Sequence, residues 1–276
     1  ARHRGCPDRV TILLIRLRQI GDVVFTTPLL AALKQHLPDA RLTYLVEPAA
    51  APIVAGHLDL SDVIVAPRTR GLGGLLADLS LGRTLAARRF DVVLDLHGGP
   101  RASLLTWLSR APRRIGYDIP GRAWMYTDRV ARPRELRPRH SVDNQADLLE
   151  VLGVPRPTRE QHPVTMPVDA RTLDSVRSRL AQHGAGAGRR VVVMHVSAGN
   201  PFRRWPVPAF AEVAATIATH EDDVRVVVTS GPSDADAAAT VIREARGRMP
   251  EAAGARVLDC GEFSLPELRA LSEIAA

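Results

Sequence analysis

The sequence predicts an α/β protein built from two blocks of parallel βαβ units, and three observations support this fold class. Short runs of β-branched and aliphatic residues alternate with longer helical patterns along the 276-residue chain. Most of these runs are apolar throughout, as expected for parallel strands that are covered on both faces. The alternation stops once, at the proline-rich segment 154–169, and then restarts. We therefore expect one domain over residues 10–155 and another over residues 165–276.

The elements of the first block follow from this alternation. The segment 129–139 is rich in arginine and proline, which predicts a loop. Gly153 is expected to end the last helix. Strands are predicted at 11–17, 41–46, 62–65, 91–96 and 113–117, and helices at 23–37, 72–89, 102–109 and 141–152.

The second block repeats the pattern after the proline-rich segment. Its last predicted helix reaches the end of the sequence without a cap or a closing strand, so we expect the natural domain to continue past Ala276. Strands are predicted at 190–196, 224–229 and 256–259, and helices at 170–183, 207–220, 234–248 and 265–276.

Composition and charge narrow the function classes. The formal net charge is +7, and Lys34 is the only lysine, so the basic character comes from arginine. A basic surface suits nucleotide diphosphates, phosphorylated glycans, acidic lipid surfaces or nucleic acid. Cys6 and Cys260 form no CxxC pair, which argues against a zinc site or a disulfide framework and fits a cytoplasmic protein. The apolar run 11–15 is too short to span a membrane.

The first candidate site is Arg18-Gln19-Ile20-Gly21-Asp22, between a predicted strand and a predicted helix. Ligands of open α/β sheets bind at the carboxyl ends of the strands, where this loop lies. Gly21 permits a tight turn and the close approach of a substrate. Asp22 is either a functional carboxylate or a cap of the following helix, since aspartate is a preferred capping residue.

The second candidate site is the loop from Ser197 to Trp205. Ser197, Ala198 and Gly199 offer free N–H groups, and a helix N-terminus follows, which together predict an anion site. Arg203 or Arg204 can bind a diphosphate through two hydrogen bonds. Alternatively, Trp205 and Pro206 only start a helix and both arginines lie in solvent.

Two further groups follow predicted strands. Gly231 and Asp234 come after strand 224–229, where Asp234 either contacts a ribose diol or caps the next helix. Asp95, His97 and Arg101 lie at the end of strand 91–96, beside two glycines. They suit the hydroxyls or phosphates of an acceptor, although a lone histidine at a strand end is more often structural. No second His or Cys lies nearby to complete a metal site.

Taken together, these segments resemble glycosyltransferase family 9, the lipopolysaccharide heptosyltransferase family. The resemblance rests on four motifs in the order and spacing of the family and extends from about residue 11 to residue 276. The motifs are 12–33 (ILLIRLRQIGDVVFTTPLLAAL), 91–117 (DVVLDLHGGPRASLLTWLSRAPRRIGY), 195–210 (HVSAGNPFRRWPVPAF) and Ser230-Gly231-Pro232.

The resemblance implies a GT-B fold of two Rossmann-like domains facing each other across a cleft, with acceptor side 10–155 and donor side 165–276. It also implies an inverting transfer from an ADP-linked sugar without a metal or other cofactor. Asp22 matches the aspartate that the family uses as the base. Arg203 stands where the family has a lysine on the donor phosphates, and Asp234 falls near an acidic residue that contacts the nucleoside.

One feature departs from the family, and the function has an alternative. An Asp-Ser/Thr-Gly…His donor motif should follow residues 265–276, where the sequence stops, so the C-terminal domain is expected to be incomplete. The predicted function is transfer of a heptose-type sugar to a cell-envelope glycan or glycolipid acceptor, with peripheral association at the inner face of the cytoplasmic membrane. The alternative is a non-catalytic nucleotide-binding module or an inactive truncated transferase. Nucleic-acid binding ranks last, because aromatic and basic residues do not interleave.

Overall fold

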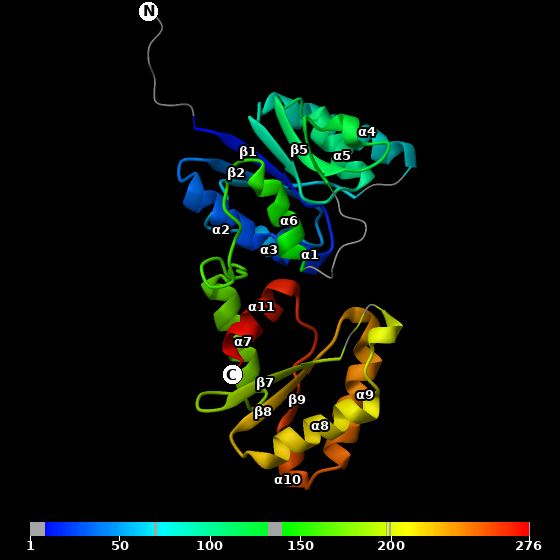
Figure 1. Cartoon of the computed structure of the whole chain (residues 1–276). Helices are drawn as coiled ribbons and strands as arrows, with labels where there is room; N and C mark the ends of the chain where they lie inside the picture. Colours follow the sequence, from blue (N-terminus) through cyan, green and yellow to red (C-terminus); the bar gives the residue numbers. More distant parts are fainter. Residues whose placement is uncertain (1–8, 69–70, 132–139, 197, 199, 276) are drawn as a thin grey trace, which may run out of the picture. The chain divides into compact units, whose positions relative to one another are not determined.

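The computed structural model of the chain describes residues 9–68, 71–131, 140–196, 198 and 200–275. The chain divides into two compact units, Ala1–Pro167 and Val168–Ala276. Each unit is an α/β body around its own parallel sheet (Figure 1). Among the described helices, none is both long and apolar enough to cross a membrane. Cys260 is free and buried, and Cys6 lies outside the described residues.

The N-terminal unit contains a parallel six-stranded sheet in the order β3-β2-β1-β4-β5-β6. β1 lies at its centre, with Ile15 opposite Leu45 of β2 and opposite Asp95 of β4. The carboxyl ends of these three strands therefore meet at one edge of the sheet. The strands are β1 (Thr11–Ile15), β2 (Arg41–Val46), β3 (Asp62–Val65), β4 (Val92–Asp95), β5 (Arg113–Asp118) and β6 (Asp128–Ala131).

Helices cover the sheet of the N-terminal unit. Leu13 and Ile15 of β1 point to one face, where they pack with Leu85 and Leu105 of α4 and α5. On other parts of the unit α2 packs against α6, and α1 against α3. The helices are α1 (Ile20–Val24), α2 (Thr27–His36), α3 (Ala51–Val54), α4 (Gly71–Ala87), α5 (Pro100–Leu108) and α6 (Ser141–Glu150), with a 3-10 turn η1 (Ala123–Met125).

The single helix predicted at 23–37 is wrong, because the chain forms two helices there. α1 ends at Val24 and α2 begins at Thr27. The hydroxyls of Thr26 and Thr27 donate to the carbonyls of Val23 and Val24, over 2.7 and 2.9 Å. Such side-chain bonds to preceding carbonyls compete with the helical ladder and favour a break at this place.

The loop predicted at 129–139 of the N-terminal unit also needs correction. Residues 129–131 belong to β6, which pairs with β5 at the edge of the sheet, while 132–139 lie outside the described residues. Part of the proline-rich segment packs on this unit: the Thr165 N–H donates to Thr27 Oγ1 over 3.0 Å, and Thr165 Oγ1 lies 2.9 Å from His57 Nε2. The boundary between the units falls after Pro167, inside the proline-rich segment 154–169.

The C-terminal unit contains a parallel three-stranded sheet in the order β7-β8-β9. Its elements lie within one or two residues of those predicted, apart from the short helix α10 and the 3-10 turns. They are α7 (Ala170–Gln182), β7 (Arg190–His195), η2 (Pro201–Arg203), α8 (Val207–His220), β8 (Val224–Thr229), η3 (Pro232–Asp234), α9 (Ala235–Gly247), α10 (Glu251–Gly254), β9 (Val257–Asp259) and α11 (Leu265–Ile274).

Both faces of this small sheet are covered, which explains why its strands are apolar throughout. Val226 and Val228 of β8 pack with α8 and α9 on one face. Val227, between them, packs with α7 and α11 on the other face. The alternation has the period of two that a strand requires. The carboxyl ends of β7 and β8 lie side by side, with His195 opposite Thr229.

Candidate functional site

Asp22 lies at the carboxyl edge of the N-terminal sheet and forms an ion pair with Arg16, which directly follows β1. A second guanidinium nitrogen of Arg16, Nη1, donates to the carbonyl of Leu96 beyond β4, over 2.7 Å. The Arg16 side chain is 13% exposed and that of Asp22 31%. The largely covered guanidinium therefore fixes a carboxylate that remains partly open to solvent.

The structure does not place Asp22 at the capping position of a helix. Asp22 is the third residue of α1, whose N-cap is Gln19, and that cap forms no side-chain hydrogen bond. The tight turn predicted at Gly21 lies instead at Gln19, where φ is +52°. A Cβ added to Gly21 would meet nothing within 4 Å, so there is open space above this residue. Arg18 is exposed and forms no ion pair with any other described residue.

Asp95 holds the loop that follows β4 from inside the protein. Its Oδ1 accepts the N–H groups of His97 and Gly98 over 2.9 and 2.8 Å, and its Oδ2 accepts the hydroxyl of Tyr126 over 2.6 Å. The carboxyl is fully buried. Burial raises the pKa of Asp95, although the hydrogen bond from Tyr126 acts in the opposite direction. Asp95 thus shapes the loop that carries His97.

Arg101, predicted on the acceptor side, is already engaged within the unit. Its guanidinium donates to both oxygens of Asp78, to Glu47 Oε1 over 2.8 Å and to the carbonyl of Pro67 over 2.6 Å. These contacts use four of the five N–H groups of the guanidinium, so any larger contact with an acceptor would release one of these partners. Glu47 is 6% exposed, so releasing it would leave a buried charge with less compensation.

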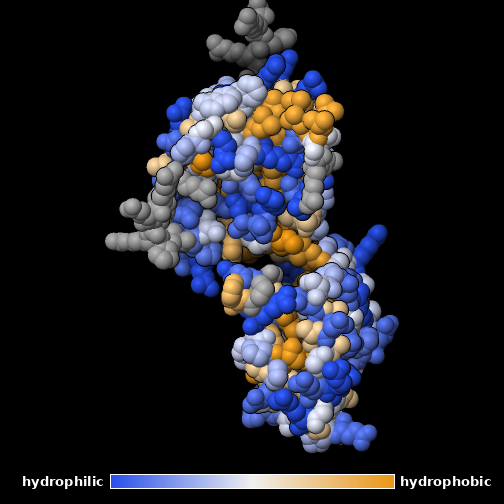
Figure 2. All heavy atoms as spheres, turned by 90° about the vertical axis from the view of Figure 1, so that its right-hand side faces the viewer, coloured by the Kyte–Doolittle hydropathy of each residue, from blue (hydrophilic) through white to orange (hydrophobic). Residues whose placement is uncertain are grey.

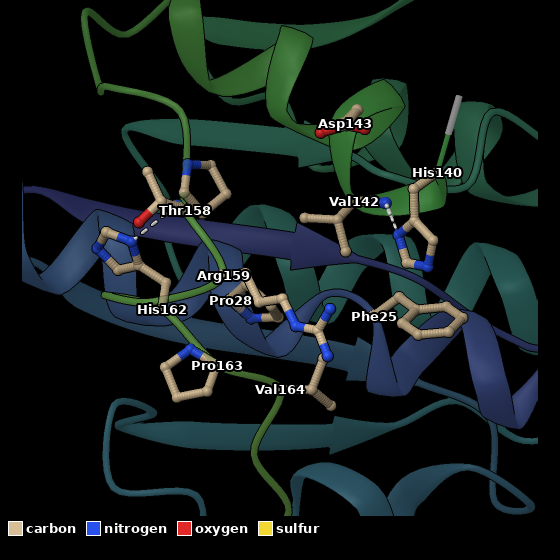
Figure 3. Close-up of a pocket in the computed structure, with 11 residues that line it drawn as sticks. Phe25, Pro28, His140, Val142, Asp143, Thr158, Arg159, His162, Pro163 and Val164 are labelled. Carbon is tan, nitrogen blue, oxygen red and sulfur yellow. Dashed lines mark hydrogen bonds between the residues drawn. The ribbon is translucent and has the colours of Figure 1, made fainter. Parts of the chain in front are cut away.

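A pocket of about 510 Å³ opens beside the end of α1, three residues beyond Asp22 (Figure 3). Phe25 and Pro28 provide apolar surface, and the ring of Phe25 meets the edge of His140 at a centroid distance of 4.6 Å. Arg159 reaches across Pro28 towards Phe25. It forms no ion pair with another described residue. An apolar floor beside a cation suits a sugar ring with an anionic substituent. The sequence did not indicate this pocket, because it combines three separate segments.

The donor-side residues lie at the carboxyl ends of β7 and β8. Arg204 Nε donates to the carbonyl of Ala198 over 3.1 Å, and its Nη2 lies 3.1 Å from Asp234 Oδ1. Arg203, at the end of η2, is exposed, and its side chain forms no ion pair with another described residue. The predicted phosphate-loop residues Ser197 and Gly199 lie outside the described residues.

Asp234 is the N-cap of α9 by position, but it forms no side-chain capping bond. It is 8% exposed and accepts the hydroxyl of Ser233 over 3.0 Å. Gly231, which precedes η3, accepts the Asp234 N–H over 3.0 Å. Nearby, His195 Nδ1 lies 3.0 Å from Thr229 Oγ1. Of the predicted donor residues, the structure thus joins Ala198, Arg204 and Asp234.

The described residues contain no group of three His, Cys, Asp or Glu side chains that could hold a metal ion. In each unit, carboxylate and guanidinium groups lie together at the carboxyl ends of the strands. This is where α/β sheets bind ligands.

Comparisons with known proteins agree with this architecture. The family profile "Glycosyltransferase family 9 (heptosyltransferase)" matches residues 79–276. Lipopolysaccharide heptosyltransferase 3 of Escherichia coli is 26% identical over 264 residues, which cover 94% of this chain and 74% of the relative.

Solved structures show the same fold. A glycosyltransferase family 9 protein from Veillonella parvula superposes with a TM-score of 0.84 at 22% identity, covering 97% of this chain and 74% of the other. E. coli heptosyltransferase WaaC with ADP superposes with a TM-score of 0.68 at 20% identity, covering 96% and 79%.

The fold and the edge residues define a glycosyltransferase of the GT-B type, with two Rossmann-like units. The chain belongs to glycosyltransferase family 9, the heptosyltransferase family. It spans about three quarters of the length of the E. coli and Veillonella relatives.

Proposed function

We propose that this protein transfers a heptose-type sugar from an ADP-linked donor to a glycan or glycolipid acceptor of the bacterial cell envelope, with inversion at the anomeric carbon. Family membership supports the sugar-transfer chemistry. The observation that carries the assignment of roles is the Arg16–Asp22 pair, a fixed and partly exposed carboxylate at the carboxyl edge of the N-terminal sheet.

In the proposed reaction an acceptor hydroxyl oxygen attacks the anomeric carbon of the donor sugar. The bond from that carbon to the diphosphate oxygen breaks, and ADP leaves with the electron pair. The hydroxyl proton passes to Asp22, which acts as general base. Because attack and departure occur on opposite faces of the carbon, its configuration inverts.

Two groups of the N-terminal unit are proposed to orient the acceptor. The pocket beside Phe25 lies within one helical turn of Asp22 and offers Arg159 to an anionic substituent. Arg18 and His97 flank the same strand edge, and Arg18 is free to meet a second anionic group. Arg101 then supports this edge through Glu47 and Asp78 rather than by binding the acceptor.

The C-terminal unit is proposed to bind ADP. Negative charge develops on the leaving diphosphate in the transition state, so preorganised donors there accelerate the reaction. Arg203 has no competing carboxylate among the described residues and is the proposed contact to the diphosphate. Asp234, held by Arg204, is the proposed contact to the nucleoside.

Replacing Asp22 with asparagine tests the proposed base. The change keeps the shape of the side chain but removes the proton acceptor, so transfer should fall by about 10²–10⁴-fold. ADP binding, measured by titration calorimetry, should stay near that of the wild type. A matched control is Asp62→Asn, which alters another exposed aspartate–arginine pair, with Arg88, at the start of β3.

The control variant is expected to transfer sugar at the wild-type rate. Retention of full transfer by Asp22→Asn would contradict the assignment of the base. Loss of transfer together with loss of the folded state would be detected by thermal melting and would call for Asp22→Glu as a second variant, which keeps a carboxylate and should retain part of the activity.

We also propose that donor binding needs no divalent metal. Arginine side chains supply positive charge at the proposed diphosphate site, and the residues described there form no cluster of carboxylates that could hold a metal ion. The expected result is an ADP isotherm that is unchanged by EDTA. An isotherm that collapses in EDTA and returns with Mg²⁺ or Mn²⁺ would contradict this proposal.

A further inference from the structure

Two hydroxyl groups are buried close to the junction of α1 and α2, in the unit that carries the proposed base. Hydrophilic residues predominate on the face of the molecule in Figure 2, as expected for side chains that water can solvate. Thr26, at the junction of the two helices, and Tyr44 of β2 are instead fully buried. A polar group in such a place is costly unless it is hydrogen-bonded, so its partners show what it holds.

The hydroxyls of Thr26 and Tyr44 form a chain of hydrogen bonds that ends on the backbone of α1. Thr26 Oγ1 donates to the carbonyl of Val23 over 2.7 Å and lies 2.7 Å from the hydroxyl oxygen of Tyr44. A threonine hydroxyl has one proton to donate. Because the proton of Thr26 is used on Val23, the proton in the second bond comes from Tyr44. The chain therefore runs from Tyr44 through Thr26 to the residue that follows Asp22.

Helix α1 needs such support because it is only five residues long. A single helical turn fixes several backbone dihedrals for few hydrogen bonds, so a helix of this length is not stable by itself. Its N-cap, Gln19, contributes no side-chain hydrogen bond. At the other end, both the N–H and the hydroxyl of Thr26 donate to the carbonyl of Val23. The position of Asp22 on this short helix thus depends on the end that Thr26 holds.

Tyr44 also lies on the side of the sheet from which the Arg16 side chain leaves. Tyr44 is opposite Leu14 in the sheet register, and Arg16 comes two residues after Leu14, so the three side chains share one face. Burial raises the pKa of Tyr44, so its hydroxyl stays a neutral donor. Its hydrogen bond and the charge of Arg16 lower that pKa, and the charge of Asp22 raises it. Both charges of the Arg16–Asp22 pair therefore act on the phenol.

We propose that Tyr44 is a positioning residue for the transfer reaction. Its hydroxyl fixes Thr26, Thr26 fixes the end of α1, and α1 places Asp22 against the acceptor hydroxyl. Arg16 holds the carboxylate directly, whereas the chain from Tyr44 holds the backbone that carries this carboxylate. The inference rests on the proposed function, because it assigns Tyr44 to the reaction in which Asp22 is the base.

Tyr44→Phe tests the role of the hydroxyl, because it keeps the ring that fills the core. Without the hydrogen bond, α1 should place Asp22 less accurately. A displacement of about 1 Å can cost about 10²-fold in rate, so we expect kcat to fall by roughly tenfold or more. The KM for the acceptor and the affinity for ADP should stay near the wild-type values, because the fully buried phenol can contact neither substrate.

Replacements of Thr26 test the same chain from its other member. Thr26→Ser keeps the hydroxyl and should retain most of the wild-type kcat. Thr26→Val keeps a similar shape without the hydroxyl and should lower kcat about as much as Tyr44→Phe does. The double variant Tyr44→Phe/Thr26→Val should be no slower than the single variants, because both residues act through one chain.

Tyr117→Phe is the matched control. Tyr117 of β5 is another buried tyrosine of the same sheet, and its hydroxyl donates to the carbonyl of Asn144 on α6 over 3.0 Å. The control variant loses a comparable hydrogen bond, so its melting temperature should fall about as much as that of Tyr44→Phe. Its kcat should equal that of the wild type.

Hydrogen exchange of the backbone reports on α1 without any substrate. Peptides that cover residues 20–26 should exchange faster in Tyr44→Phe than in the wild type, because the short helix opens more often once its end is released. The same peptides should exchange at the wild-type rate in Tyr117→Phe.

Three results would overturn the proposal. One is a wild-type kcat in Tyr44→Phe when Asp22→Asn abolishes transfer, because the proposed base would then stand without a role for Tyr44. Another is an equal loss of kcat in Tyr44→Phe and Tyr117→Phe, which would indicate a general effect of stability. The third is unchanged exchange of residues 20–26 in Tyr44→Phe. Full transfer by Asp22→Asn would instead contradict the proposed base, and the positioning role with it, whatever the exchange shows.

Discussion

The two units each hold an aspartate against an arginine at the carboxyl ends of their strands, but in opposite ways. In the N-terminal unit both partners are partly buried, and the carboxylate is the more exposed of the two: Arg16 is 13% and Asp22 31% exposed. In the C-terminal unit the carboxylate is buried and the arginine exposed: Asp234 is 9% and Arg204 49% exposed. The first pair thus presents an anion to solvent, and the second presents a cation.

This difference matches the two kinds of chemistry that we propose. A base must reach a substrate proton with its own oxygen, so its partner should hold it from behind. A diphosphate site needs positive charge, so a carboxylate there should be withdrawn from the surface. The same pair of residue types therefore supports opposite roles, depending on which partner the fold buries.

Among the changes to the partners of these carboxylates, the largest effect is expected when Arg16 of the first pair is removed. Arg16→Ala leaves Asp22 in place but without the group that orients it, and a misplaced catalytic group can cost about 10²-fold in rate. We expect kcat to fall while the affinity for ADP stays constant. Arg16→Lys should restore part of the rate, because a single ammonium can still meet the carboxylate.

Arg88→Ala is the control for this change, since Arg88 pairs with Asp62 far from the loop of Asp22 along the sheet. It should leave kcat unaltered. If Arg16→Ala and Arg88→Ala behave alike, or if Arg16→Ala changes only the melting temperature, Arg16 has a structural role and does not position the base.

A smaller effect is expected at the second pair, and here two adjacent arginines serve as each other's control. Arg203→Ala should weaken ADP binding by roughly tenfold or more, because about 1.4 kcal/mol of lost hydrogen bonding is a factor of ten. Arg203→Lys should recover much of the loss. Arg204→Ala should act mainly on Asp234, whose buried carboxylate would lose its partner, and should lower the melting temperature more than Arg203→Ala does.

Titration calorimetry with ADP and thermal melting of both variants decide between these roles. Unchanged affinity in Arg203→Ala with a large loss in Arg204→Ala would mean that Arg204 is the phosphate contact. In that case Asp234 would position the arginine that binds the phosphate, whereas in the first pair the arginine positions the carboxylate.

The sequence predicted much of this framework, because each element carries its own local signal. β2, β3, β8 and α8 begin and end at the predicted residues, since their apolar runs and flanking turn residues are distinct. β6 was missed because Asp128–Ala131 is a short edge strand with a polar, partly exposed pattern. The break between α1 and α2 depends on two threonine hydroxyls, whose conformation is not visible in a hydrophobic pattern.

The sequence also identified only part of the candidate site. Asp22, Arg203, Arg204 and Asp234 could be selected because they follow predicted strands. Arg16 was not selected, although a charged residue directly after an apolar strand was a usable signal. Its role emerges only from the sheet register, which places the end of β1 beside β4 and so brings the Leu96 carbonyl within reach.

Asp95 differs from both Asp22 and Asp234, because it is a buried carboxylate that forms no ion pair with a described arginine. Its oxygens are satisfied by two N–H groups and by the Tyr126 hydroxyl, and burial raises the pKa of Asp95 in the folded protein. A raised folded-state pKa means that the stability contributed by this group is full below its unfolded pKa of about 3.9. That stability is lost as the pH rises through the folded-state value.

Asp95→Asn isolates this contribution, which we expect to be the smallest of the three effects. The asparagine carbonyl can accept the same two N–H groups. Its amide can donate to the Tyr126 hydroxyl, which then donates to Ser103 Oγ, 2.7 Å away. Chemical denaturation of both proteins should show the variant gaining stability relative to the wild type as the pH is raised from about 4 to neutrality. A relative stability that falls with rising pH would mean that the hydrogen bonds to Asp95 outweigh its burial and stabilise the anion, and a flat one would mean that folding leaves its pKa unchanged; either result would contradict the prediction.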